Sequence, residues 1–361
     1  MIGLPELFEE LYARKGSDVH IAPGYPPTLR VRGELMPIGN ERLSAEDANE
    51  MLLPLLHEYH RRVFDATGDL DWAYQYDTRG RFRVSYFRKT TGVGGVFRSI
   101  PSHIATLDEL DVPIGVRKLV DVRSGLVLVT GPTGSGKTTT LAAMIDQINR
   151  TRSMRVLTIE DPIEFVHKSR KAIVTHKEIG HHVPSFPEAI RSAARENPDV
   201  ILVGELRDAE TMKAALQLAS FGVLVFASVH TNSAAATIDR YVNAFSADQQ
   251  PQIRGLLAES LAGIIAQQLV RRADGVGRVA VHEILFSSLA LSGLIRDAKP
   301  QQIPSLMQSG LADGMQPMDW AIERAVASGA ITAQDGLEKA LDKDSFAKLP
   351  SIASRLANEP V

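Results

Sequence analysis

The sequence predicts an α/β fold in its larger second part and a smaller α+β unit in its first part. After about residue 114, short apolar runs recur between helical patterns. Such runs are typical of strands that are buried on both faces of a parallel sheet. Before that point, strand candidates alternate apolar and polar residues, which is typical of half-buried antiparallel strands. The length of 361 residues fits two such domains.

The composition excludes several classes of function. The chain has no cysteine, so a disulfide scaffold, a cysteine nucleophile and a thiolate zinc site are excluded. Lys and Arg number 40 against 43 Asp and Glu, and this net charge of -3 argues against a strongly basic nucleic-acid binder. No run approaches the roughly 18 apolar residues of a membrane span, and the acidic start is unlike a secretory signal. We therefore expect a soluble, cytoplasmic protein.

The first domain is predicted over residues 1–100. A helical pattern at the start leads to two short strands, which are separated by a turn rich in Pro and Gly. Ser44 is placed to open a helix, with Asp47 completing a capping box. Residues 101–113 lack a clear period, begin and end with proline, and form the predicted linker. The predicted strands of this domain cover 19–21, 28–31, 70–76, 81–88 and 93–100.

The second domain is predicted over residues 114–285 and is followed by a helical region over 286–361. Its strand candidates, all expected in one parallel sheet, cover 126–129, 156–159, 200–203, 224–229 and 279–285. His282 and Glu283 lie in the last of these runs and are expected to be buried. Helical patterns in the last region cover 289–295, 303–307, 318–326 and 334–341.

The strongest motif is a glycine-rich loop that follows an apolar run and opens a helical pattern. It matches G-x-x-x-x-G-K-[ST], in which backbone N–H groups and a helix N-terminus converge on phosphate oxygens. Lys137 would contact the β- and γ-phosphates, and the Thr138 hydroxyl would ligate Mg²⁺. The predicted nucleotide-binding residues are Gly131, Pro132, Thr133, Gly134, Ser135, Gly136, Lys137, Thr138 and Thr139.

Acidic side chains and one histidine follow the next predicted strands. Glu160 and Glu164 come after the run 156–159, at the sheet edge where ligands bind in open α/β sheets. One carboxylate there would orient the attacking water while another supports Mg²⁺. Glu205 follows the run 200–203, with Gly204 standing where an Asp that supports the metal is usual. His230 ends the run 224–229 as a candidate γ-phosphate sensor or a hydrogen-bonded strand terminus. No N-K-x-D element for reading guanine is present.

Four elements in this order resemble the type IV pilus retraction ATPases, the PilT family within the secretion ATPases. They are the phosphate loop, T-I-E-D-P-I-E-F, P-D-V-I-L-V-G-E-L-R-D and S-V-H-T-N-S-A-A. The resemblance implies ATP and Mg²⁺ as cofactors and a RecA-like motor domain preceded by a PAS-like domain. It makes Glu164 the general base for water, Glu205 the acid near Mg²⁺ together with Glu160, and His230 the sensor.

The same resemblance implies a homo-hexamer with nucleotide sites shared between subunits. Arg83 and Arg98 look like the family's arginines that approach the γ-phosphate across a domain or subunit boundary, although Arg79, Arg81 and Arg88 lie close to Arg83. Such a motor would act from the cytoplasmic side, at the inner face of the inner membrane, on a pilus platform protein, and a paralogous pilus motor ATPase is a further expected partner. Its activity would be pilus retraction, the basis of twitching motility.

Two segments depart from the family pattern. Residues 221–224 read F-G-V-L where the family has T-G-H-L, so Val223 replaces a histidine. Residues 290–296 read A-L-S-G-L-I-R where the family has A-I-R-N-L-I-R, so Ser292 replaces an arginine. The residues of the chemistry are thus kept while those linked to retraction differ, which favours a divergent paralogue.

Three alternatives remain at this point. A pilus-assembly or type II secretion ATPase typically carries a four-cysteine zinc module, and this chain has no cysteine. A RecA-like nucleic-acid motor would need a basic channel with stacking aromatics, whereas aromatic residues make up 6% of the chain. A regulatory paralogue that binds ATP without hydrolysing it is disfavoured by Glu164 and Glu205. We therefore expect partners that are proteins and not nucleic acids.

Overall fold

The structure is a computed structural model, which describes residues 2–77, 80–100 and 103–357. Contacts divide the chain into two compact units. The first contains the residues up to 103 together with the segments 160–166 and 178–184. The second contains 104–159, 167–177 and the residues from 185 onwards. Residues 104–113 thus lie in the second unit, where Leu107 and Val112 are buried in its core.

The first unit is built on a six-stranded sheet in which each described pairing is antiparallel. Each predicted strand of this unit is present, and the capping box forms as predicted, with Ser44 N donating to Asp47 Oδ2 (2.7 Å) and Asp47 N to Ser44 Oγ (3.1 Å). The strand Glu34–Pro37 was not predicted, because all its residues are exposed and it carries no alternation of burial. The strand order is β3 (Glu34–Pro37), β2 (Thr28–Val31), β1 (Asp18–Ile21), β6 (Gly92–Ile100), β5 (Gly80–Lys89) and β4 (Asp69–Tyr76).

Three helices pack onto this sheet and close an aromatic core. Phe8 of the first helix stacks on Phe82 of β5, with ring centroids 4.2 Å apart. Phe97 of β6 meets the same Phe8 ring edge-on. Because these rings come from distant parts of the chain, their packing ties the helix to the middle of the sheet. The helices are α1 (Leu4–Ala13), α2 (Ala45–Leu52) and α3 (Glu58–Thr67), with a 3-10 turn, η1 (Leu53–Leu55), after α2.

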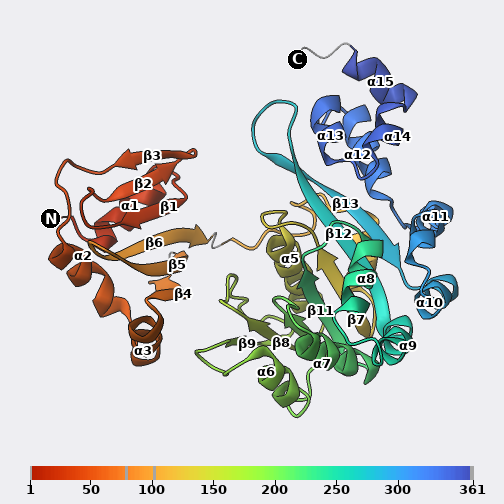
Figure 1. Ribbon diagram of the computed structural model, residues 1–361, viewed down its shortest axis with the longest axis horizontal. Helices are drawn as coiled ribbons and strands as arrows, with labels where there is room; N and C mark the ends of the chain where they lie inside the picture. Colours follow the sequence, from red (N-terminus) through yellow and green to blue (C-terminus); the bar gives the residue numbers. More distant parts are fainter. Residues whose placement is uncertain (1, 78–79, 101–102, 358–361) are drawn as a thin grey trace. The chain divides into compact units, whose positions relative to one another are not determined.

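The second unit contains a seven-stranded mixed sheet, seen in yellow, green and blue in Figure 1. Five central strands, from β12 to β8 in the order below, are parallel. This part of the prediction is confirmed: a buried parallel sheet, with β7, β11 and β10 buried along their whole length. The order is β13 (Arg278–Phe286), β12 (Leu261–Arg271), β7 (Gly125–Thr130), β11 (Leu224–Val229), β10 (Val200–Val203), β8 (Arg155–Glu160) and β9 (Ile173–Glu178).

One strand direction was predicted wrongly. The run 279–285 was expected to be parallel to its neighbours, but β13 is antiparallel to β12. A short hairpin joins the two strands, and a chain that turns back within a few residues pairs antiparallel. Gly275 and Gly277 of that hairpin have φ values of 74° and 86°, in the left-handed region that favours glycine. The strand β12 was not predicted, because it follows a helix without a breaking residue and is rich in Ala, Leu and Gln.

Helices cover both faces of this sheet. α4 (Ile114–Val120) and α5 (Lys137–Thr151) share one apolar core with one face, while α7 (Ala209–Ser220) and α8 (Ala234–Asn243) pack against the other. None of the helices within the described residues is both long and apolar enough to cross a lipid bilayer. The remaining helices between the strands are α6 (Phe186–Ala193) and α9 (Gln250–Ser260).

The helical region predicted after the sheet is present and gathers beside the β12–β13 hairpin (Figure 1). Its core contains Met318 and Ile322 from the helices and Ala266, Val270 and Val281 from the two strands. The elements are α10 (Leu289–Arg296), η2 (Pro300–Gln302), α11 (Ile303–Ser309), η3 (Leu311–Asp313), α12 (Met318–Ala327), α13 (Ala333–Lys339), α14 (Lys343–Ala347) and α15 (Pro350–Leu356).

His282 and Glu283 are both buried, as predicted, with 2% of each residue exposed. No hydrogen-bond partner for His282 Nε2 lies among the residues that the structure describes. Burial lowers the pKa of His282 from 6.5 to about 4. His167 is buried in the same unit, and burial, helped by the neighbouring His176, lowers its pKa to about 4 as well.

These two histidines are expected to make the fold sensitive to acid. Between the folded pKa of about 4 and the unfolded pKa of 6.5, each histidine binds more protons in the unfolded chain than in the folded one. Stability therefore rises with pH over this range and levels off near pH 7. Each histidine should cost about 2 kcal/mol of unfolding free energy when the pH falls from about 7 to about 5. Denaturant melts of His282→Leu should show a fall smaller by that amount. The exposed His57→Leu is the control and should keep the parent's fall; equal falls in both variants would contradict the assignment.

Candidate functional site

The glycine-rich loop lies between the end of β7 and the start of α5, as the motif predicted. Gly136 caps the helix with a φ of 87° and Gly131 has a φ of 151°, both in the region that favours glycine. Pro132, Thr133 and Thr138 are exposed, whereas Lys137 is 8% exposed. The loop thus presents the first N–H groups of a 15-residue helix together with one lysine, and this arrangement fits a polyphosphate.

Lys137 bends back over the loop. Its Nζ donates to the carbonyl oxygens of Gly131 (2.8 Å) and Pro132 (3.0 Å) and lies 3.5 Å from His230 Nδ1. Burial lowers the pKa of Lys137, and the negative charge of Glu205 opposes that shift. The ammonium group is therefore held at the mouth of the loop, with a carboxylate near enough to favour its charged form.

Glu205, His230 and Lys137 form a continuous chain of polar contacts. His230 Nε2 lies 3.2 Å from Glu205 Oε1, while Nδ1 faces the lysine. A carboxylate only accepts and an ammonium group only donates, so these partners assign the proton to Nε2 and leave Nδ1 as the acceptor. The histidine thus links the lysine of the loop to the acid that follows β10.

The sheet explains why these three residues meet. β11 lies beside β7, with Val229 paired to Thr130, so His230 leaves the sheet next to the loop. β10 is the neighbour of β11 on its other side, which places Glu205 close to His230. Parallel strands end at the same edge, and Lys137, His230 and Glu205 gather there for that reason.

Three residues that were not predicted support this arrangement. Thr130 Oγ1 donates to Thr231 O (2.7 Å) and accepts from Thr231 N (3.0 Å), so the segment after His230 is fixed to the end of β7. Arg207 Nε lies 3.0 Å from Glu205 Oε2. A threonine that ends a fully buried apolar strand was the signal available for Thr130. Arg207 lies in the element P-D-V-I-L-V-G-E-L-R-D, which carried the family resemblance but gave this arginine no role.

Glu283 of β13 also helps to fix the segment that follows His230. Its Oε1 accepts from Ala234 N (2.6 Å) at the start of α8, and its Oε2 accepts from Met318 N (3.3 Å) at the start of α12. Burial raises the pKa of Glu283, and these two hydrogen bonds partly oppose the rise. One buried carboxyl group therefore joins the first turns of two helices.

The acidic segment 160–166 belongs to the first unit. Side chains of that unit form hydrogen bonds with its main chain. Arg81 Nε donates to Ile163 O (2.8 Å), and Ile163 N donates to Glu178 Oε2 (3.0 Å). Arg81 and Glu178 are themselves 3.1 Å apart. The peptide groups of Ile163 are thus held from both sides, and this fixes the segment that carries Glu164.

Within the arginine cluster, the structure separates two roles that the sequence left open. Arg81 holds the backbone of the acidic segment, whereas Arg83 Nη1 lies 3.7 Å from Glu164 Oε1. Arg98 is the cross-strand neighbour of Arg83 and pairs with Asp18, with 2.8 Å between Nε and Oδ1. Burial alone would raise the pKa of Asp18, but hydrogen bonds from Ser17 and Arg98 lower it overall.

Glu160 ends β8 with 6% of its surface exposed, and its carbonyl oxygen accepts from Ile179 N (2.9 Å). It stands at the carboxyl edge of the sheet, as predicted. No group of three or more His, Asp or Glu side chains in the described ranges is arranged to hold a metal ion. The Thr138 hydroxyl is exposed beside the loop, and a hydroxyl oxygen is a ligand that suits Mg²⁺ bound mainly by the phosphates of its substrate.

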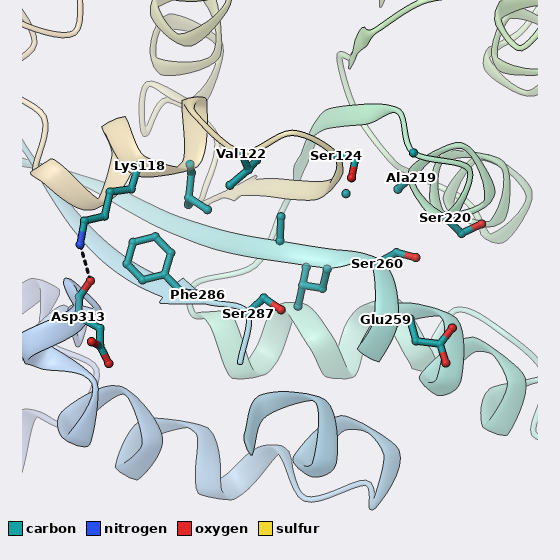
Figure 2. A pocket seen from close by; sticks show the side chains of 15 residues that line it. Lys118, Val122, Ser124, Ala219, Ser220, Glu259, Ser260, Phe286, Ser287 and Asp313 are labelled. Atoms are coloured by element: carbon teal, nitrogen blue, oxygen red, sulfur yellow. Dashed lines mark hydrogen bonds between the residues drawn. The ribbon is translucent and has the colours of Figure 1, made fainter. Parts of the chain in front are cut away.

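A cavity of about 670 Å³ lies elsewhere in the second unit (Figure 2). Its walls come from the end of α4, the first residues of β7 and β12, the end of α7 and the end of β13. At one side Lys118 Nζ donates to Asp313 O (2.7 Å), and Glu259 lines the other side. It contains none of the predicted site residues, because it opens at the amino end of β7, whereas the glycine-rich loop follows the carboxyl end.

A glycine-rich loop that opens α5, with lysine, histidine and carboxylate gathered at one edge of a parallel sheet, defines a P-loop nucleotide-binding protein. The model of the type II/IV secretion system protein family matches residues 82–335.

Two relatives from Pseudomonas aeruginosa extend this match over nearly the whole chain. The type IV pilus retraction ATPase PilT is 44% identical over 335 residues, covering 92% of this chain and 97% of that protein. The type IV pilus ATPase PilU is 38% identical over 335 residues, covering 93% of this chain and 88% of that protein. A crystal structure of the pilus retraction motor PilT with bound ADP superimposes with a TM-score of 0.89 at 40% identity, covering 96% of this chain and 99% of that one.

The chain belongs to the PilT family of type II/IV secretion ATPases, as its motifs predicted. It is a pilus retraction ATPase or a paralogue of one. The predicted α/β fold, with an N-terminal domain before the ATPase domain and a helical C-terminal region, is confirmed by the same match.

Proposed function

We propose that the protein hydrolyses ATP to ADP and phosphate with Mg²⁺ and uses the reaction to retract type IV pili, either as the main motor or as its accessory paralogue. The observation that carries the proposal is the contact chain from Lys137 through His230 to Glu205 at the mouth of the glycine-rich loop. It joins the group that binds phosphate to an acid and to a residue able to report whether the phosphate is present.

In this mechanism, ATP binds with its phosphates against the N–H groups of the loop, and Lys137 exchanges its carbonyl partners for phosphate oxygens. When bound, Mg²⁺ would supply positive charge to the phosphates. Thr138, Glu205 and Glu160 are the residues we assign to it. When Lys137 turns to the phosphates, the His230 ring loses its Nδ1 contact and is free to turn its N–H from Glu205 to a γ-phosphate oxygen, which only accepts.

Glu164 is the proposed general base that takes a proton from the attacking water. Its side chain is partly exposed, on a segment whose backbone is held by Arg81 and Glu178. Such support matters because a general base acts only when its oxygen lies within hydrogen-bond reach of the water. Arg83 faces the same carboxylate, and we assign it, with Arg98, to the developing charge on the γ-phosphate.

We further propose that the active form is a homo-hexamer in which the arginines of one subunit complete a neighbour's nucleotide site. An arginine supplied in this way links hydrolysis to movement between rigid units. The ring would act at the inner face of the inner membrane on the pilus platform protein, with a paralogous motor as a further partner. Support comes from the likeness to PilT and PilU over most of the chain.

The accessory role is favoured by the two departures from the family motifs, at Val223 and Ser292. The structure shows what the second of them does. Ser292 of α10 donates to Ala258 O of α9 (2.6 Å), so the position that the family pattern gives to arginine is used here for helix packing. Arg296 at the end of that helix stays within 3.7 Å of Glu259. The surface on which the family's retraction motif lies is therefore less basic in this chain.

Deletion and complementation in the host test the proposal. Deleting the gene should reduce twitching and the rate of pilus retraction, and the wild-type gene should restore both. The Lys137→Ala gene should fail to restore them at equal protein level if this chain is itself a hydrolysing motor. Normal twitching and normal retraction force in the deletion strain would contradict a part in retraction. A defect repaired equally by Lys137→Ala would overturn hydrolysis as the contribution of this chain.

A further inference from the structure

Gln267 lies beneath the glycine-rich loop, in the middle of β12, with 2% of its surface exposed. Both ends of its side-chain amide are used by the loop and its helix. Nε2 donates to Ser135 O (2.7 Å), and Oε1 accepts from Thr140 Oγ1 (2.7 Å). The Ser135 carbonyl oxygen only accepts, so it fixes the orientation of this buried amide: a flip would place Gln267 Oε1 against that oxygen and oppose two acceptors.

From this geometry we propose that Gln267 is a positioning residue that sets the direction of the Ser135–Gly136 peptide and thereby the nucleotide affinity of the loop. The proposal rests on the nucleotide binding of the proposed function. Gln267 lies 127 residues beyond Thr140 in the sequence and belongs to no phosphate-loop motif.

The peptide group between Ser135 and Gly136 is planar. In a trans peptide the C=O and the following N–H point in opposite directions. Because Ser135 O is held by Gln267 on β12, the N–H of Gly136 points away from that strand. Gly136 is the N-cap of α5, and an N–H at this place is one of the groups that converge on a phosphate.

The loop also packs closely against Gln267. A Cβ added at Gly136 would lie 2.8 Å from Gln267 Nε2, and one added at Gly131 would collide with the carbonyl oxygen of Gln267. The two glycines therefore serve contact with β12 as well as backbone conformation. Both ends of the loop therefore lie in contact with Gln267.

Gln267 also fixes the first turn of α5 through Thr140. Thr140 is buried, and its backbone N–H donates to Gly136 O (3.0 Å) while its hydroxyl donates to Gln267. The same side chain thus fixes the loop carbonyl before the helix and the end of the helix's first turn. Lys137 and Thr138, the residues assigned to phosphate and Mg²⁺, lie between these two points.

The next residue provides a matched control. Gln268 has the opposite orientation in the strand, and its Nε2 donates to Lys339 O (3.2 Å) of the C-terminal helices. It is the same residue type on the same strand, with a similar hydrogen bond, yet it has no contact with the loop in the described residues.

Binding of a fluorescent ADP analogue to the full-length protein tests the proposal. Gln267→Met keeps the length of the side chain but leaves Ser135 O and the Thr140 hydroxyl without partners. Affinity should fall about 10-fold or more, and the KM for ATP should rise by more than kcat falls. Gln268→Met should bind the analogue as the parent does. The melting temperature without nucleotide shows whether Gln267→Met remains folded.

Thr140→Val is the second variant and decides the matter if Gln267→Met does not fold. It removes one of the two hydrogen bonds and should lower affinity about 3-fold to 10-fold. A folded Gln267→Met with affinity within about two-fold of the parent would overturn the proposal, as would an equal loss in Gln268→Met. If Gln267→Met is unfolded, an unchanged affinity in Thr140→Val has the same meaning. Failure of the parent itself to bind the analogue would instead refute the proposed function.

Discussion

Lys137→Ala is expected to reduce ATP turnover by about 1,000-fold or more. The ammonium group lies over the glycine-rich loop, where it is held by two carbonyl oxygens and His230. Its removal takes away one of the positive charges that we assign to the γ-phosphate, in a site that is partly shielded from water. The measurement is phosphate release at saturating ATP.

The control for this variant is Lys168→Ala, which removes an exposed lysine in the same unit. It should keep the parent rate. A Lys137→Ala rate within about ten-fold of the parent would show that phosphate is not bound by this loop and would refute the motor hypothesis. Nucleotide affinity, measured in the same samples, should fall as well, because the lysine binds both the substrate and the transition state.

Glu164→Gln is expected to bind ATP with nearly the parent affinity and to hydrolyse it about 100-fold to 1,000-fold more slowly. The amide keeps the size of the side chain but cannot accept a proton. The segment is held through the peptide groups of Ile163 by Arg81 and Glu178, so the substitution should leave the backbone unchanged. Single-turnover hydrolysis, with ATP binding measured separately, distinguishes the two effects.

Glu205→Gln is the matched comparison, since Glu205 contacts His230 and Arg207. It should raise the Mg²⁺ concentration needed for half-maximal activity, an effect that Glu164→Gln should lack. If Glu205→Gln were instead the slower enzyme at unchanged Mg²⁺ requirement, the two roles would be reversed.

The sequence predicted those features whose cause is local. The glycine-rich loop is specified by eight consecutive residues, and the capping box at Ser44 by four, so a short pattern identifies each. The buried strands of the parallel sheet were found for a similar reason, because β7, β10 and β11 are apolar along their whole length.

What the sequence did not reveal depends on residues far apart in the chain. Gln267 meets Ser135 across 132 positions, and Arg81 meets Ile163 across 82. No local pattern contains such pairs. β12 was missed because Ala, Leu and Gln favour a helix in isolation, whereas pairing on both sides with β7 and β13 stabilises the strand. The direction of β13 was predicted wrongly for the same reason, because its antiparallel partner in the hairpin is β12.

The alternation of β12 also determines where the chain can be extended. Consecutive residues face opposite sides of the sheet, so inserting or deleting one residue within the strand would exchange Gln267 with Gln268 and reverse both contacts at once. The hairpin tip over residues 272–277 carries no such constraint: all its residues are exposed, and Val276 is 76% exposed. A small tag or fluorophore inserted at this tip would therefore report on the working protein without disturbing its nucleotide loop.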